Sequence, residues 1–192
     1  MGVRADQKER TREALVTAGR QLFAEHGYAA VGLSALVATA GVTKGALYHH
    51  FDGKAELFEA VLALVQSEVA AAVEVAADAE DDPWEQLRAG CREFLVASTA
   101  PGTARIMLVD GPAVLGWSRW RALDDDASGR LLVGALRAAV AADRLAPGPV
   151  EPLAHVLSGA LNEAALRLAE SDSPDLGATW GAIDRILTGL AR

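Results

Sequence analysis

The sequence predicts an all-α protein of about nine helices, with an N-terminal three-helix helix-turn-helix domain and a larger helical body. Apolar residues recur at the three- and four-residue spacing of helices, and no alternation typical of strands stands out. Alanine and leucine dominate, and glycine and proline fall mainly between the periodic segments. With 192 residues, of which 51% are apolar, the chain can bury a hydrophobic core and is not expected to be disordered.

Three helical patterns open the chain. The first, over residues 7–26, has an apolar stripe with charges opposite, and Gly27 follows it where a helix end favours a left-handed residue. The second covers about 33–39 and the third about 44–50, with Gly41 as the turn between them. This pattern predicts a helix-turn-helix, a motif that places its second helix in the DNA major groove.

The rest of the sequence predicts six further helices. The fourth begins near Lys54, and Asp82 and Pro83 supply the N-cap and the first residue of the fifth. The expected ranges are 54 to beyond 70, ended by the acidic stretch 78–82; 83–98; 103–110, stopping at Gly111-Pro112; 116–143, bending around Gly129; 150–170; and a last helix, started by Ser173-Pro174, over about 175–191.

Charge divides the chain into two predicted domains, 1–54 and 55–192. The formal net charge of −8, taken alone, argues against a nucleic-acid partner. However, residues 1–54 hold seven Lys or Arg, including all three lysines, against five Asp or Glu, whereas residues 55–192 hold eleven Arg against 21 acids. The N-terminal domain is therefore the basic part of an acidic protein, and we expect DNA to approach it there.

The sequence predicts a soluble, cytoplasmic protein with no membrane partner. Cys91 is the single cysteine, so no intrachain disulfide can form, and a reducing compartment is expected. The N-terminus has no apolar run of the kind that signal peptides carry. The longest uncharged run, 26–43, falls short of the ~20 residues that span a bilayer and is interrupted by three glycines.

The helix expected at 44–50 has one apolar face and one small, polar face. At about 100° per residue, Leu47 and Phe51 share a face that should bury against the first two helices. Thr43 and Lys44 stand at the helix start, where backbone N–H groups and the helix dipole favour a phosphate. Small residues on the opposite face let the helix approach base edges closely. The residues expected to face outward are Thr43, Lys44, Gly45, Ala46, Tyr48 and His49.

Four side chains are candidate contacts to the DNA backbone, because each carries a hydrogen-bond donor. Tyr48 has a hydroxyl, His50 an imidazole N–H and Lys54 an ammonium, and Ser34 lies in the first turn of the second helix. Other interpretations stay open: Tyr48 can be structural, His49 an ordinary surface residue, and His50 bonded within the domain. Adjacent histidines do not face one point on a helix, so no metal site is predicted, and no cofactor.

Four segments of the N-terminal sequence form a specific combination of motifs: Gln21-Leu22-Phe23, Gly27-Tyr28, Ala40 to Phe51, and Lys54-Ala55-Glu56-Leu57. This combination, over roughly residues 10–60, resembles the DNA-binding domain of the TetR family of transcriptional regulators. The resemblance implies an α-helical homodimer, a ligand pocket in the C-terminal domain, and release of operator DNA when a small molecule binds. Carried over by position, the DNA-facing residues are Ser34, Thr43, Lys44, Gly45, Tyr48, His49, His50 and Lys54.

One position departs from the family pattern. Gly32 stands where the family usually has Thr or Ser before the second helix. Glycine is tolerated as an N-cap but brings no hydroxyl, so one contact to a phosphate is missing.

The candidate ligand-binding residues are polar or adaptable side chains on otherwise apolar helices. Trp117 and Trp120 stand at i, i+3, so both indoles share a face, which fits either core packing or a pocket wall. The run Asp124-Asp125-Asp126 is interpreted as a solvated face or turn, because consecutive acids diverge on a helix. The candidates are Arg105, Met107, Trp117, Trp120 and Asn162, for an effector that the sequence does not identify.

The helices near 150–170 and 175–191 are expected to form a homodimer interface. Small residues such as Ser158 and Gly159 permit close packing, so two helices from each copy can make a four-helix interface. An ordinary intrachain core is the alternative.

The predicted function is a ligand-responsive, DNA-binding transcriptional regulator: a repressor that binds a palindromic operator as a dimer and is released by a small molecule. An enzyme is the second hypothesis, but the sequence lacks Gly-x-Ser-x-Gly, His-Glu-x-x-His and a phosphate loop, so no catalytic residue is predicted. A helical dimeric binding module that no longer reads DNA is the third, and the exposed polar face expected at 44–50 argues against it.

Overall fold

A computed structural model describes residues 3–192, and it confirms the all-α fold within them. The described residues contain no strand, only an isolated bridge between Leu145 and Ala191. Segments η1 and η2 are π-helical, and each continues directly into the next helix. The elements are α1 (Val3–His26), α2 (Leu33–Thr39), α3 (Lys44–His50), α4 (Lys54–Asp78), α5 (Pro83–Ser98), η1 (Arg105–Asp110), α6 (Gly111–Leu115), α7 (Trp117–Asp124), η2 (Asp125–Gly129), α8 (Arg130–Ala141), α9 (Val150–Glu170) and α10 (Leu176–Leu190).

The chain forms two compact units, and each unit is built from two separate stretches of the sequence. The first unit combines the residues up to Val65 with Pro101–Trp120, and the second combines Gln66–Ala100 with Arg121–Arg192. Both α4 and α7 therefore contribute residues to both units. The predicted domain boundary at residue 54 stays a prediction, because the compact units divide the chain differently: Pro101–Trp120 belongs with the N-terminal helices.

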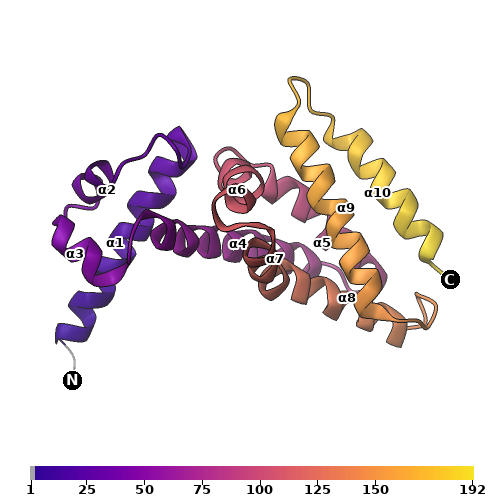
Figure 1. The fold of residues 1–192 in the computed structure, drawn as a ribbon. Coiled ribbons are helices and arrows are strands. Elements are labelled where there is room, and N and C mark those ends of the chain that lie inside the picture. Colours follow the sequence, from indigo (N-terminus) through magenta and orange to yellow (C-terminus); the bar gives the residue numbers. More distant parts are fainter. Residues whose placement is uncertain (1–2) are drawn as a thin grey trace. The chain divides into compact units, whose positions relative to one another are not determined.

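The first unit is organised around α1, beside which α2 and α3 lie (Figure 1). An aromatic cluster joins α1 to the start of α4: Phe23 and Phe58 meet edge to face with ring centroids 5.3 Å apart, and Tyr28 lies 5.1 Å from Phe58. Gly27, at φ 78°, ends α1 as expected. The fully buried large side chains of this unit are Leu15, Phe23, Leu36, Leu47, Leu57, Phe58, Leu62, Ile106 and Met107.

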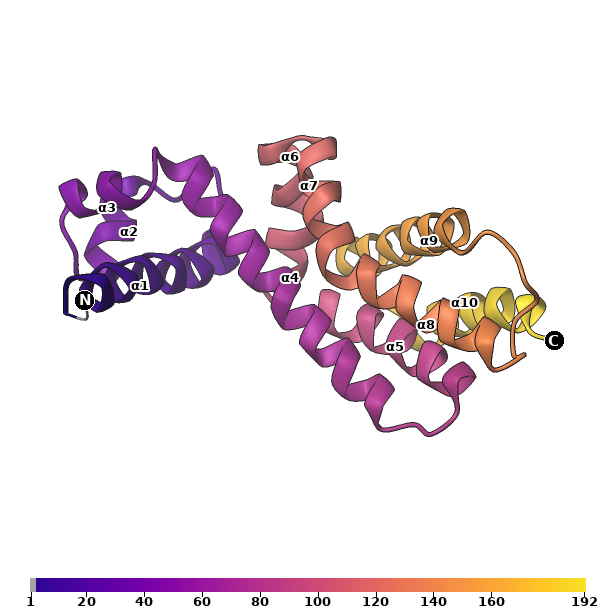
Figure 2. The same cartoon turned by 90° about the horizontal axis from the view of Figure 1, so that it is seen from below.

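The second unit is a helical bundle in which α5, α8, α9 and α10 lie side by side (Figure 2). The Asp82 carboxylate caps α5 by accepting from the backbone N–H of Trp84 at 2.9 Å, with Pro83 as the first helical residue, as the sequence predicts. On the bundle surface, Arg88 of α5 donates to Asp184 of α10 at 2.7 Å.

One predicted helix boundary and one predicted start signal are wrong. The helix expected to stop at Gly111-Pro112 continues there as α6, because proline fits the first turn of a helix, and it ends at Gly116, at φ 77°. The last helix, Leu176–Leu190, agrees with the expected range of about 175–191, but its start signal is Asp175 and not Ser173-Pro174. Asp175 is the N-cap and accepts from the N–H of Ala178. The bend expected near Gly129 corresponds to η2.

Among the described helices, α4 is long and apolar enough to span a bilayer by length and composition. Only part of its apolar surface is buried within the fold, but that part includes Leu57, Phe58, Val61 and Leu62, which have no exposed surface. A core helix of a soluble protein passes the same test, so this feature is weak evidence for a membrane.

Candidate nucleic-acid interface

The turn between α2 and α3 has the geometry of a helix-turn-helix. Gly41 adopts φ 67°, which only glycine takes without strain. The N–H of Val42 then bonds the carbonyl of Val37 at 3.0 Å and closes the end of α2. At the other end of α2, Gly32 provides no side-chain cap, so the hydroxyl that the family pattern places there is missing.

Helix α3 is fixed by a cap at its start and by buried side chains along one face. The Thr43 hydroxyl oxygen accepts from the N–H of Ala46 at 3.2 Å. Leu47 has no exposed surface, and Phe51, which follows the helix, is 3% exposed. Leu36 of α2 is also fully buried, whereas Val37 is half-buried. The buried face predicted for this motif is therefore confirmed, with Val37 at its edge.

The opposite face of α3 is open. Lys44, Gly45, Tyr48 and His49 are exposed, and half of the Tyr48 side chain is accessible. The Lys44 ammonium lies 6.0 Å from the centroid of the Tyr48 ring. A Cβ atom added at Gly45 would meet only the Thr43 hydroxyl, at 3.8 Å. This side of the helix thus presents a cation, a phenol, an imidazole and a shallow position at Gly45.

His50 differs from its neighbours because it is partly enclosed. Its ring lies 6.5 Å from that of Phe51 and 5.8 Å from that of His49. Burial lowers the pKa of His50 below its ordinary value, and the charges of His49, Lys8 and Arg12 lower it further. A neutral imidazole here can form a hydrogen bond to a phosphate but does not supply a charge.

Lys54 is held inside the first unit by three interactions. Its ammonium donates to the carbonyl of Tyr28 at 2.8 Å and to that of Val31 at 2.9 Å. It also lies 4.0 Å from the centroid of the Tyr28 ring. Two of its three donors therefore close the loop between α1 and α2, which leaves one donor for a phosphate. Sequence reasoning assigned Lys54 to DNA alone and missed this structural role.

Two further cations of α1 lie near α3. The Arg12 guanidinium stacks over the Phe51 ring, 5.6 Å from its centroid, and is exposed. Lys8, one turn earlier on α1, acts electrostatically on His50. Sequence reasoning did not include either among the DNA contacts, although both stand on the charged side of the first predicted helix. Ser34, which it did include, is exposed in the first turn of α2.

The structure does not bring the five candidate ligand-binding residues together. Met107 is fully buried, and its carbonyl accepts from the indole N–H of Trp120 at 2.7 Å. Trp117, in contact with Trp120, is 65% exposed. Arg105 is exposed and donates to the carbonyl of Glu25, so it belongs to the first unit, whereas Asn162 is buried in the second.

Asp124 does not lie on the solvated face that its sequence context suggests. It is 1% exposed, and Oδ2 accepts from Arg121 at 2.9 Å, Ser158 at 3.3 Å and Asn162 at 3.2 Å. Only Asp126 of the acidic run is exposed. Asp124 faces inward because η2, which follows it, packs against α9. Ser158 and Asn162 stand at i, i+4 on α9, so both side chains reach Asp124 from the same face of that helix.

Comparison with known proteins assigns the family. A family model described as bacterial regulatory proteins, tetR family, matches residues 15–61, and one described as Tetracyclin repressor-like, C-terminal domain, matches residues 84–190. The crystal structure of a TetR-family transcriptional regulator from Pectobacterium atrosepticum is 33% identical, with a TM-score of 0.83, over 98% of this chain and 97% of that one.

Curated relatives match over shorter stretches. The transcriptional repressor AcnR of Corynebacterium diphtheriae is 39% identical over 67 residues, 35% of this chain and 34% of AcnR. The transcriptional activator FasR of Mycolicibacterium smegmatis is 34% identical over 93 residues, 48% of this chain and 42% of FasR. The alignments cover between 25% and 50% of the length of such relatives.

The fold and the motif define an α-helical regulator with an N-terminal helix-turn-helix. The two family models together match most of the sequence, and the Pectobacterium structure matches nearly all of it. The chain belongs to the TetR family of bacterial regulatory proteins.

Proposed function

We propose that this chain is a ligand-responsive transcriptional repressor that acts in the cytoplasm, binds a palindromic operator as a homodimer and is released by a small molecule. The observation that carries the proposal is the outward face of α3. It is exposed and carries Lys44, Tyr48 and His49, while its opposite face is packed into the first unit. A helix with one such face is free to enter a major groove.

The residue types on this face suit DNA contact. Gly45 adds no side chain and Ala46 only a methyl group, so the helix backbone can come close to the base edges. Lys44 and Tyr48 carry donors that reach phosphate oxygens, and His49 can read a base edge or a phosphate. Lys8 and Arg12 of α1 would add positive charge beside the same groove.

Removal of the Tyr48 side chain tests the proposed face. Tyr48→Ala is expected to weaken operator binding about tenfold, since a hydrogen bond to a charged group such as a phosphate is worth about 1.5–3 kcal/mol. Tyr48 is half exposed, so the thermal stability should change little. Gel-shift titration measures the affinity, with Tyr48→Phe as the control that removes only the hydroxyl. Unchanged affinity in Tyr48→Ala contradicts the assignment of this face.

The proposed dimer interface lies on α9 and α10, which carry apolar residues on their exposed sides. Val156 of α9 is 70% exposed and Ile186 of α10 is 51% exposed. Gly159 and Gly189, which follow on the same helices, add no bulk. Large apolar side chains exposed beside small residues favour close helix packing with a second copy.

A charge on this surface should separate the dimer. Val156→Glu is expected to shift the protein from dimer to monomer in sedimentation experiments, because pairing two copies would bury the carboxylate without a partner. Val75→Glu is the matched control: Val75 is also a strongly exposed valine, at 73%, but stands on α4. A dimer that persists in Val156→Glu, or that is lost equally in Val75→Glu, contradicts this interface.

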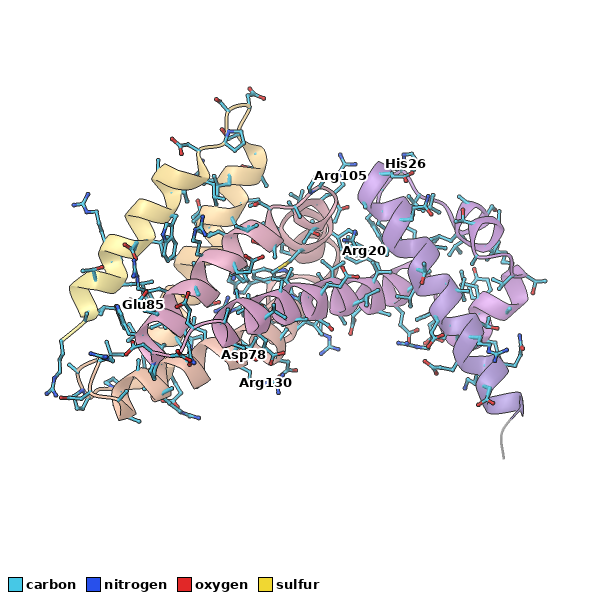
Figure 3. All side chains as sticks on the ribbon, turned by 180° about the vertical axis from the view of Figure 1, so that it is seen from behind. Arg20, His26, Asp78, Glu85, Arg105 and Arg130 are labelled. Carbon is cyan, nitrogen blue, oxygen red and sulfur yellow. The ribbon has the colours of Figure 1, made fainter. Side chains whose placement is uncertain are left out.

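The contacts of residues 101–120 with the end of α1 suggest how an effector would act. The Asp110 carboxylate accepts from the N–H of Tyr28 at 2.8 Å, and Arg105 donates to the carbonyl of Glu25 at 3.1 Å. Arg20 and Arg105 face this junction near His26 (Figure 3). Helix α7 starts in this segment and continues into the second unit. A ligand bound in the second unit can therefore strengthen or weaken the contacts of Asp110 and Arg105 with the end of α1. Such coupling is typically worth about 1–3 kcal/mol.

Repression itself is tested by transcription. A reporter behind the bound operator should become more active when the gene is deleted and when effector is added. Lower activity on deletion would assign activation, as in the relative FasR, and would overturn the repressor part of the proposal.

A further inference from the structure

The second unit contains a cavity of about 340 Å³ between the C-terminal half of α4, α5, η2, α8 and α9. Its walls are mostly apolar, and this volume falls in the range of small-molecule sites. Three charged residues that line the cavity are exposed and mark its solvent side: Glu74, Asp78 and Arg130. Asp78 and Arg130 lie at the same end of the bundle (Figure 3). The apolar lining includes Val73, Leu87, Cys91, Phe94, Leu132 and Leu161.

Two serine hydroxyls interrupt this apolar wall. Ser128 of η2 and Ser158 of α9 both line the cavity, and they are 9% and 8% exposed. Within residues 3–192, nothing forms a hydrogen bond with the Ser128 hydroxyl. A buried hydroxyl without a partner destabilises the unliganded protein, so a ligand that forms a hydrogen bond with it gains affinity.

The Ser158 hydroxyl is part of a buried network that leaves its oxygen able to accept. Ser158 donates to Asp124 Oδ2 at 3.3 Å, and Asn162 Nδ2 donates to the same Oδ2 at 3.2 Å and to the Ser158 carbonyl at 3.1 Å. Asn162 Nδ2 also lies 3.4 Å from the Ser158 hydroxyl oxygen, which has a second lone pair for a ligand donor. The second oxygen of Asp124 and the side-chain oxygen of Asn162 have no donor among the described residues. The network behind Ser158 is therefore rich in acceptors and short of donors.

The charges around the cavity argue for a neutral ligand. Asp124 is already paired with Arg121 at 2.9 Å, so it offers no net charge for a cation. An anion would meet two carboxylates, Glu74 and Asp78, on the exposed side, against one cation, Arg130. Burial raises the pKa of the Cys91 thiol to about 12, so this side chain is a neutral part of the wall.

We propose that this cavity binds a neutral small molecule with an apolar body and one hydroxyl group. The ligand hydroxyl donates to the oxygen of Ser158 and accepts from the hydroxyl of Ser128, and the apolar body lies against the walls formed by α4, α5 and α8. The inference rests on the proposed function only in that such a molecule would be the effector.

Calorimetric titration of the full chain with three matched probes tests the ligand class. The probes are 4-propylphenol, propylbenzene, which lacks the hydroxyl, and 4-propylbenzoate, which carries a negative charge. We expect 4-propylphenol to bind about tenfold or more tightly than propylbenzene, because propylbenzene leaves the Ser128 hydroxyl unsatisfied. We expect 4-propylbenzoate to bind most weakly of the three. Equal affinity for the phenol and propylbenzene, preference for the benzoate, or no binding of 4-propylphenol overturns the proposal.

Two variants locate the site. Ser128→Ala should remove most of the preference for 4-propylphenol over propylbenzene while leaving propylbenzene affinity unchanged; retained preference overturns the role of Ser128. Ala135→Phe fills the cavity from α8 and should abolish binding of both probes, with folding checked by the helical circular dichroism signal. Binding that survives in a folded Ala135→Phe protein places the ligand elsewhere and overturns the site.

Calorimetry separates this inference from the proposed function, since it needs no DNA. If 4-propylphenol binds as expected but leaves operator binding unchanged, the cavity stands and the effector role fails. If operator binding is sound but no probe binds, the inference fails alone.

Discussion

Replacement of Gly45 by glutamate is expected to reduce DNA affinity by roughly 100-fold while the protein is at least as stable as the wild type. A carboxylate on the outward face of α3 would meet the phosphates and base edges of the groove, and juxtaposed like charges cost several kcal/mol. The side chain itself fits, since a Cβ atom at Gly45 meets only one atom, at 3.8 Å. Glutamate is also a better helix former than glycine by about 0.5–1 kcal/mol. Fluorescence anisotropy on operator DNA and thermal unfolding measure the two effects.

Gly148→Glu is the matched control for this substitution. It adds the same charge at another exposed glycine, in the loop before α9. No atom lies within 4 Å of a Cβ added at Gly148, so the side chain fits there too. Its DNA affinity should be within about threefold of the wild type, as expected for one distant, screened charge. Equal losses in both variants would mean that net charge, not the face of α3, governs binding. Full affinity in Gly45→Glu would contradict the DNA-binding face itself.

Replacement of Lys54 by methionine is expected to destabilise the first unit by about 2–3 kcal/mol. The ammonium donates to two backbone carbonyls, of Tyr28 and Val31, and a hydrogen bond to a charged group contributes about 1.5–3 kcal/mol net. Because Lys54 is only half-buried, the two bonds together are expected to fall at the low end. Val31 is 3% exposed, so its carbonyl has little access to water after the substitution. Chemical denaturation followed by circular dichroism measures the free energy of unfolding.

Lys44→Met is the control for the loss of one lysine. Lys44 is exposed, so its substitution should lower the free energy of unfolding by less than about 0.5 kcal/mol, as is usual for surface positions. It should nevertheless weaken DNA binding and lower the salt dependence by about one unit of slope. The two lysines therefore separate a structural cation from a DNA contact. If Lys54→Met unfolds like the wild type and changes only the salt dependence, Lys54 is the phosphate contact that its sequence position suggests.

The N-terminal motif could be predicted well because its determinants are local. Gly27 and Gly41 each take a positive φ that glycine favours, and Leu47 and Phe51, four residues apart, mark the buried face of α3. Likewise Asp82 followed by Pro83 is a helix start that short-range hydrogen bonding alone explains. Exposure of the α3 face follows from the same periodicity.

The role of Lys54 could not be predicted, since it depends on contacts between residues far apart in sequence. Its partners Tyr28 and Val31 precede it by 26 and 23 residues, and only the folded loop brings their carbonyls to its ammonium. A lysine after a recognition helix looks the same in sequence whether it contacts a phosphate or the protein.

The roles of several residues after residue 100 also depend on contacts between segments far apart in the sequence. Asp124 stands in a run of three acids that looks solvated, yet the packing of η2 against α9 turns it toward Ser158 and Asn162. Met107 looked adaptable, and Trp120 fitted either core packing or a pocket wall; both are buried, and the indole N–H of Trp120 donates to the Met107 carbonyl. A cavity is formed by surfaces from several helices, so helical periodicity within one segment cannot reveal its lining.

The most direct test of the central claim is a footprint of the wild-type protein on the DNA upstream of its own gene. A dimer that presents two α3 faces should protect two half-sites about one helical turn, or roughly 34–36 Å, apart. Protection should persist in excess random DNA and weaken steeply as salt rises. Absence of any protected palindrome, or protection that random DNA removes at equal concentration, would contradict the account that α3 reads an operator.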